Sequence, residues 1–171
     1  DEDRDITESD RRLLESIFNF RERIAREIMR PRVNVFCLPE SVSLQEAAFL
    51  MQKEGYSRVP VYRGTIDSII GVIFYKDILA AYVSAQKTHN EDLLQETIKK
   101  HIKKIYYCPE TKKISALLQE FRKKQTHLAL VVDEYGGTSG LVTIADILAE
   151  IVGAIADDYD DIETLAQQVD E

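Results

Sequence analysis

A block of about seventy residues occurs twice in the sequence, and this internal repeat constrains the fold more than any other feature. Three stretches of the first copy return in the second copy, in the same order and with nearly the same spacing. The matching stretches are 39–41 with 109–111, 58–61 with 127–130, and 71–79 with 140–148. Because chance would not preserve order and spacing together, we interpret the chain as two copies of one structural unit.

Each copy predicts the element series β-α-β-β-α. In the first copy Ser43 and Glu46 have the spacing of a capping box at a helix start, and Gly55 supplies the helix end. We expect the first copy to have strands at 33–37, 58–62 and 68–74, a turn at Gly64, and helices from Ser43 and Tyr75. The second copy predicts strands near 104–107 and at 128–133 and 138–143, a helix over 114–121, a turn at 134–137, and a helix through Ile155.

One such copy has a small sheet with one apolar face, which it cannot bury alone. Two copies packed face to face can bury both sheets, so the sequence predicts an α/β (α+β) fold with a pseudo-twofold pair of repeats. A helix with apolar positions Leu13, Ile17, Ile24 and Ile28 precedes the pair. The expected organisation is an acidic head and N-terminal helix at 1–30, repeats at 31–90 and 91–156, and an acidic linker or tail at 157–171.

Composition and charge exclude several classes of function. The net charge is −8, with acid concentrated at both ends, which argues against nucleic acid as a partner. No run of eighteen apolar residues is present, and the chain opens with Asp1 and not with Met, so we expect a piece of a longer protein. Cys37 and Cys108 lie far apart without zinc-like spacing, which fits a reduced cytosolic compartment.

Catalysis and metal binding find little support in the sequence. Three histidines, at positions 89, 101 and 127, have no nearby nucleophile or carboxylate arranged around them, so we expect no enzyme. The acidic run 157–161 lacks the glycine and the closing glutamate of a calcium-binding EF-hand loop, so we expect no metal site.

The end of the last strand of the second copy carries the best candidate binding residues. Thr143 stands where a helix begins, and Asp146 follows three positions later on the same face. A helix N-terminus is a ready anion site, so Thr143 could hold a phosphate while Asp146 accepts the two hydroxyls of a ribose. The same two residues also make a capping box, which only stabilises the helix start. The residues by themselves leave both interpretations open.

These residues resemble a known family. The pattern Gly-hydrophobic-hydrophobic-Thr-x-x-Asp at 140–146, repeated after about seventy residues, looks like the CBS domain. The string Asp-Glu-Tyr-Gly-Gly at 133–137 is similar to the CorC/HlyC branch of that family, which contains hemolysin-C-like proteins linked to magnesium and cobalt efflux and is related to the animal cyclin M transporters. The resemblance covers residues 24–160.

The resemblance implies an adenosine nucleotide, AMP, ADP or ATP with or without Mg²⁺, bound between the two copies. The residues implicated in nucleotide binding are Tyr56, Ser57, Arg58 and Pro60 of the first copy with Thr143 and Asp146 of the second. Pro60 has no N–H to donate to a neighbouring strand, so it indicates a free strand edge that could face the ligand.

The pseudo-symmetric site departs from this pattern. Phe74 replaces the threonine, although Asp77 keeps the aspartate, and His127 and Ala129 replace Arg58 and Pro60. We therefore expect a degenerate second site at Asp77 and His127, and one competent nucleotide site. Near the competent site, Arg30 and Ala145 stand where relatives often have other residues, which bears on the choice between ATP and AMP.

The resemblance also implies partners. We expect a homodimer through helices of both copies, near Ile78, Leu79, Ile147 and Leu148, with membrane and C-terminal domains of the parent protein outside this chain. The pair is then expected at the cytoplasmic face of the cell membrane. The alternative function is a ligand-free structural module that dimerises the same parent protein.

Overall fold

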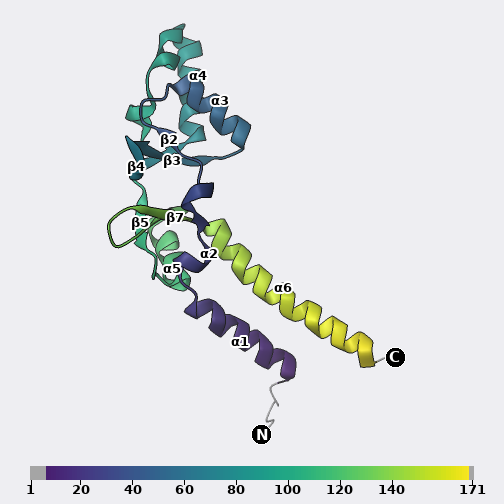
Figure 1. Ribbon diagram of the computed structural model, residues 1–171. Coiled ribbons are helices and arrows are strands. Elements are labelled where there is room, and N and C mark those ends of the chain that lie inside the picture. The colour runs from purple at the N-terminus through teal and green to yellow at the C-terminus, as the bar shows by residue number, and fades with distance from the viewer. Residues whose placement is uncertain (1–6, 170–171) are drawn as a thin grey trace.

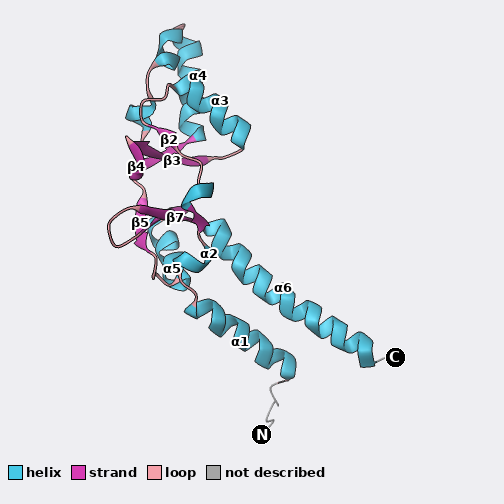
Figure 2. Cartoon of the chain, in the orientation of Figure 1, coloured by secondary structure: helices cyan, strands magenta, loops and turns pink. Residues whose placement is uncertain are grey.

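A computed structural model describes the backbone of residues 7–169 and the side chains of residues 7–156. Within this part of the chain the strands form two sheets, one in each repeat, and helices cover their outer faces (Figures 1 and 2). The expected α/β pair of repeats is confirmed.

The first repeat is built on a three-stranded sheet. Its strands are β2 (Leu38–Pro39), β3 (Arg58–Arg63) and β4 (Thr65–Phe74), in the order β2-β3-β4. Helices α3 (Leu44–Glu54) and α4 (Tyr75–Thr88) pack on it around a core that includes Leu44, Met51 and Ile78. The short 3-10 helices η2 (Glu91–Gln95) and η3 (Ile98–His101) lead to the second repeat.

Local sequence signals set the ends of helix α3, although only the Ser43 half of the predicted capping box is formed, without a return bond from the Glu46 side chain. The Ser43 hydroxyl accepts a hydrogen bond from the Glu46 amide at 3.1 Å, which satisfies one of the free N–H groups of the first turn. At the other end Gly55 has a φ of 77°, a left-handed conformation that costs glycine little. The helix therefore begins and ends where its sequence predicts.

The second repeat has the same arrangement with one additional strand. Its own strands are β5 (Tyr106–Pro109), β6 (Leu128–Val132) and β7 (Thr138–Thr143), and its helices are α5 (Ile114–Lys124) and α6 (Ile144–Val169). The sheet order is β1-β7-β6-β5, in which β1 (Arg30–Pro31) comes from the N-terminal segment and lies antiparallel to β7.

The segment before the first repeat therefore crosses to the sheet of the second repeat and returns. The predicted strand at 33–37 is wrong, because this stretch contains the 3-10 helix η1 (Arg32–Asn34) and carries the chain from one sheet to the other. While this stretch passes between the two sheets, its backbone cannot form the hydrogen bonds of a strand in either sheet. The first repeat's own edge strand begins only at Leu38, which pairs in parallel with Val61.

Two glycines at equivalent places permit these crossings. An added Cβ at Gly140 would clash with the Arg30 carbonyl oxygen, and one at Gly71 would clash with the Lys103 carbonyl oxygen. Arg30 of β1 pairs with Leu141 in the sheet of the second repeat. In the same way Lys103, which precedes β5, bridges to Val72 in the sheet of the first repeat. The segment before each repeat therefore contacts the sheet of the other repeat. Glycine at these positions allows two backbones to approach closely.

The two sheets face each other across a shared apolar layer. Its buried members come from both repeats, and they are Ile69, Val72, Ile105, Leu128, Leu130 and Leu141. This contact buries the apolar sheet faces that neither repeat could cover alone, which is the physical reason for the pair.

The N-terminal helix differs from its prediction. It is divided into α1 (Glu8–Glu22) and α2 (Ala25–Ile28), because Ile24 pairs with Lys113 and the Ala25 amide donates to the Lys112 carbonyl oxygen. Helix α1 buries none of its residues and lies beside α6, so the start of α1 and the end of α6 are on the same side of the molecule (Figure 1). Helix α6 continues to Val169, well past the predicted end at Ile155 and into the acidic segment that we expected to be a linker.

Candidate functional site

A cleft of about 260 Å³ lies between the repeats and is lined by both of them. Five of the six predicted nucleotide-binding residues line it, namely Tyr56, Ser57, Arg58, Pro60 and Thr143. Asp146 is outside this lining, one position beyond Ala145, which does line the cleft. We refer to this space as the Thr143 cleft.

The register of β3 explains why its first residues are open to a ligand. β2 pairs with β3 only at Val61 and Tyr62, so residues 58–60 have a strand neighbour, β4, on one side only. Pro60 pairs in register with Val72 of β4 and is buried. The free edge that the proline predicted is thus present over these residues, although β3 is the central strand of its sheet.

Thr143 and Asp146 form a reciprocal cap at the start of α6. The Asp146 amide donates to the Thr143 hydroxyl oxygen at 3.1 Å, and the Thr143 amide donates to Oδ2 of Asp146 at 3.0 Å. The capping interpretation is therefore realised. It leaves the Thr143 O–H free to donate, and within the described residues Oδ1 of Asp146 accepts no hydrogen bond, so the cap is compatible with a ligand.

The Thr143 cleft is also lined by an aromatic pair, of which the sequence predicted Tyr56 as a site residue but not Phe36. The Phe36 and Tyr56 rings are stacked, with centroids 5.7 Å apart and planes 13° from parallel. The Arg30 guanidinium lies over the Tyr56 ring, 5.6 Å from its centroid, and also donates to the Tyr56 hydroxyl at 3.2 Å. Arg30 and Phe36 reach the cleft because the N-terminal segment crosses between sheets, which no local pattern predicts.

A second cleft of about 380 Å³ lies at the pseudo-symmetric position, and we refer to it as the Phe74 cleft. Phe74 occupies the place that corresponds to Thr143, and His127 lines both clefts. Asp77, the other predicted residue of the degenerate site, is outside the lining. Its buried Oδ2 accepts no hydrogen bond in the described structure and lies 3.8 Å from Lys103 Nζ.

A family model settles what kind of pair this is. The model of the CBS domain matches residues 25–84 and again residues 98–153, which are the two repeats described above. The chain is a pair of CBS domains.

The curated relatives of this CBS pair are much longer proteins. It is 41% identical over 156 residues to UPF0053 protein YrkA of Bacillus subtilis (strain 168), and 36% identical to Hemolysin C of Brachyspira hyodysenteriae. Each alignment covers 91% of this chain, but only 35% of YrkA and 54% of Hemolysin C. The CBS pair thus spans about a third to a half of these relatives.

Solved structures of CBS pairs match the fold closely. The CBS domain of a bacterial CNNM/CorC family Mg²⁺ transporter in complex with ATP has a TM-score of 0.75 and 40% sequence identity, over 84% of this chain and 96% of that one. A CBS-domain pair with bound AMP from Klebsiella pneumoniae has a TM-score of 0.60 and 27% identity, over 75% and 98% of the two chains.

The described residues contain neither a cluster of metal-ligating side chains nor a membrane-spanning helix. Over the part of the CBS pair with described side chains, no group of three His, Cys, Asp or Glu residues could hold a metal ion. None of the helices traced here is long and apolar enough to span a bilayer.

Burial raises the pKa of Cys37 and of Cys108 to about 11, so both thiols stay protonated at neutral pH.

Proposed function

We propose that this CBS pair is a non-catalytic regulatory module that binds one adenosine nucleotide in the Thr143 cleft. Its parent is proposed to be a CorC/HlyC-type protein that serves magnesium or cobalt efflux, with the pair at the cytoplasmic face of the membrane. Membrane and C-terminal domains of the parent would lie outside this chain.

One observation carries the proposal: a single cleft is lined by an aromatic pair and by a helix N-terminus. The stacked Phe36 and Tyr56 rings would offer an aromatic surface to a base once Arg30 moves off the Tyr56 ring, and base–aromatic stacking is worth about 1–3 kcal/mol. In the same cleft, Thr143 lies at the start of α6, where the helix dipole favours a phosphate. An adenosine nucleotide presents a base and a phosphate at the two ends of one molecule, which matches this arrangement.

The place of each residue in the cleft suggests which part of the nucleotide it would contact. We assign the adenine to the β3 edge, with Pro60 and the backbone of residues 56–58 as its support. Thr143 would donate its hydroxyl to a phosphate oxygen, and Asp146 would accept the ribose hydroxyls through Oδ1 after a small side-chain rotation. The solved CBS structures with ATP and with AMP support this class of ligand.

The charges at this cleft bear on the number of phosphates. Arg30 lines the cleft, is held against Tyr56 and could extend toward a β- or γ-phosphate. Ala145, at the start of α6, adds no carboxylate that would repel them. Both features favour a nucleotide with more than one phosphate, bound with or without Mg²⁺.

A binding titration tests the proposal and separates it from the alternative of a ligand-free dimerisation module. AMP, ADP, ATP and Mg-ATP are each titrated calorimetrically, and unfolding is followed with each ligand present. A nucleotide at a hundred times its dissociation constant should add about 2.7 kcal/mol to the free energy of unfolding. Absence of binding and of stabilisation by all four would leave the dimerisation module as the function.

A further inference from the structure

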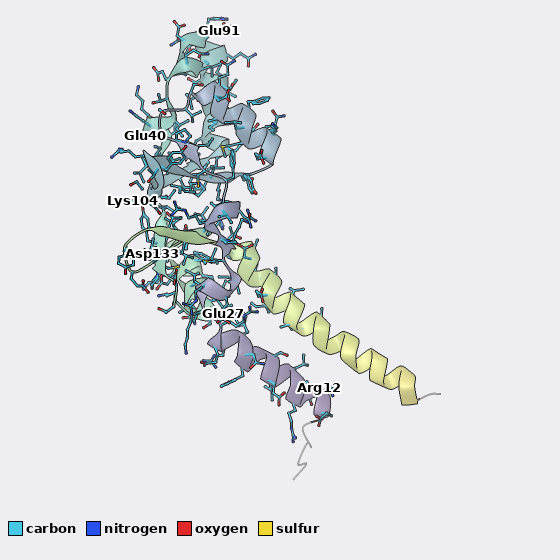
Figure 3. The ribbon with its side chains drawn as sticks, viewed as in Figure 1. Arg12, Glu27, Glu40, Glu91, Lys104 and Asp133 are labelled. Carbon is cyan, nitrogen blue, oxygen red and sulfur yellow. The ribbon has the colours of Figure 1, made fainter. Side chains whose placement is uncertain are left out.

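The Phe74 cleft has a chemistry different from that of the Thr143 cleft. Its lining includes the cationic side chains of Arg58, Lys76 and Lys104, together with His127. No aspartate or glutamate is among the described residues that line it. Lys104 lies at the junction between the two repeats, where Figure 3 labels it. Positive charge that converges on one concave space attracts anions.

Adenosine does not fit this cleft well. The Phe74 ring fills the position of the threonine hydroxyl, and Arg58 and Lys76 lie over that ring at 5.7 and 5.5 Å from its centroid. The residue that corresponds to Tyr56 is Gln125, so no aromatic ring stands at that position, and the Phe74 ring already carries the two cations. The cleft keeps the cations of a phosphate site without the features that hold a nucleoside.

Two groups at this cleft lack hydrogen-bond partners among the described residues. Nε of Arg58 is buried and, among the described residues, has no hydrogen-bond acceptor, which is costly for a charged group. Helix α4 begins after Phe74 without any side-chain cap, whereas α6 has the Thr143 cap. An anion bound here would accept a hydrogen bond from Arg58 Nε and would also interact with the free amides at the start of α4.

We propose that the Phe74 cleft binds a small phosphate-bearing anion, such as pyrophosphate, which carries no nucleoside. Arg58 supplies a planar fork suited to phosphate oxygens, and Lys76 and Lys104 supply point charges from α4 and from the chain before β5. Arg58 and His127 line both clefts, so the anion would also change the electrostatic potential at the nucleotide.

Calorimetric titration of the chain with pyrophosphate at low ionic strength tests this proposal. We expect one pyrophosphate per chain. The double variant Lys76→Gln/Lys104→Gln should weaken binding about tenfold, because two partly solvated charge contacts are lost. The matched control Lys99→Gln/Lys100→Gln removes the same charge from residues outside the cleft and should leave affinity nearly unchanged. Absence of binding, or equal weakening in both double variants, would overturn the proposal.

The location of binding is checked separately by amide chemical shifts. Pyrophosphate should shift the amides of Tyr75 and Lys76 at the start of α4 and those of residues 125–127. Shifts centred on Ile144 and Ala145 would place the anion in the Thr143 cleft and overturn the proposal, whatever nucleotides do there.

Discussion

Asp67, on β4 of the first repeat, accepts a hydrogen bond from the Thr138 amide on β7 of the second repeat at 3.3 Å. The Thr138 hydroxyl in turn donates to the Ile66 carbonyl oxygen at 2.7 Å, and Arg32 forms an ion pair with the Asp67 carboxylate. One carboxylate therefore ties together both repeats and the segment that crosses between them.

This tie predicts a pH-dependent stability. The Arg32 side chain, and then the Thr138 amide, hold the Asp67 pKa below its ordinary value near 3.8. The stabilisation is fully present above about pH 4 and is lost as pH falls through the lowered pKa, because the unfolded chain binds the proton first. Asp67→Asn should therefore be less stable than wild type at neutral pH, and the difference should vanish in strong acid.

Urea unfolding between pH 7 and pH 2 measures this difference. Glu91→Gln is the control, since Glu91 lies at the far end of the first repeat and makes no hydrogen bond or ion pair in the described structure (Figure 3). A pH-independent gap between Asp67→Asn and wild type would mean that the contact acts through shape and not through charge.

The nucleotide site predicts different effects for two equivalent aspartates. Asp146→Asn keeps the shape but removes the charge that we assign to the ribose hydroxyls, and hydrogen bonds to charged groups contribute about 1.5–3 kcal/mol. Nucleotide affinity should fall roughly tenfold to a hundredfold. Asp77→Asn, at the equivalent position of the first repeat, should change nucleotide affinity little. Both variants should fold, because the asparagine oxygen at position 146 can still accept from the Thr143 amide, and Asp77 makes no side-chain cap on α4. Calorimetry giving equal affinities for wild type and both variants would remove Asp146 from the site.

Nucleotide stoichiometry should be one per chain. The Phe74→Thr variant restores the missing hydroxyl, yet Gln125 and His127 still form the base side of that cleft, so a second tight nucleotide site should not appear. Titration of wild type with ATP to a stoichiometry of two would contradict the assignment of a single competent cleft.

Because the N-terminal segment crosses close to Gly140, alanine substitution should affect stability very differently at Gly140 and at Gly153. Gly140→Ala should destabilise the fold by about 1–3 kcal/mol or more, because its Cβ would overlap the Arg30 carbonyl oxygen and lie 2.8 Å from the Met29 sulfur. Gly153→Ala is the matched control. Nothing lies within 4 Å of its added Cβ on helix α6, so stability should rise by up to about 1 kcal/mol. Thermal unfolding of both variants decides whether this close approach exists in solution.

The last prediction concerns the oligomeric state of the chain. Ile78 and Ile147, which we expected at a dimer contact, are fully buried in the cores of their own repeats. Leu79 and Leu148 remain about half exposed on α4 and α6, so these two can still form the contact. The wild-type chain should be a dimer at micromolar concentration, and Leu79→Glu/Leu148→Glu should be a monomer with unchanged circular dichroism. Light scattering that shows a wild-type monomer would rule this contact out.

The sequence by itself determined the features that depend on neighbours along the chain. Ser43 and Gly55 bound α3, Thr143 and Asp146 cap α6, and the repeat of about seventy residues required two units that bury each other's sheets. Capping, turn formation and hydrophobic periodicity act within a few residues, so they can be read without a fold.

Tertiary structure decided what depends on residues far apart in sequence. Arg30 and Phe36 reach the Tyr56 ring only because β1 joins the other repeat's sheet, and Asp67 meets Thr138 only because the sheets face each other. The break between α1 and α2 has the same origin, since backbone pairing of Ile24 with Lys113 replaces helical hydrogen bonds. Such contacts are selected by the packing of the whole chain, and no local pattern of residues encodes them.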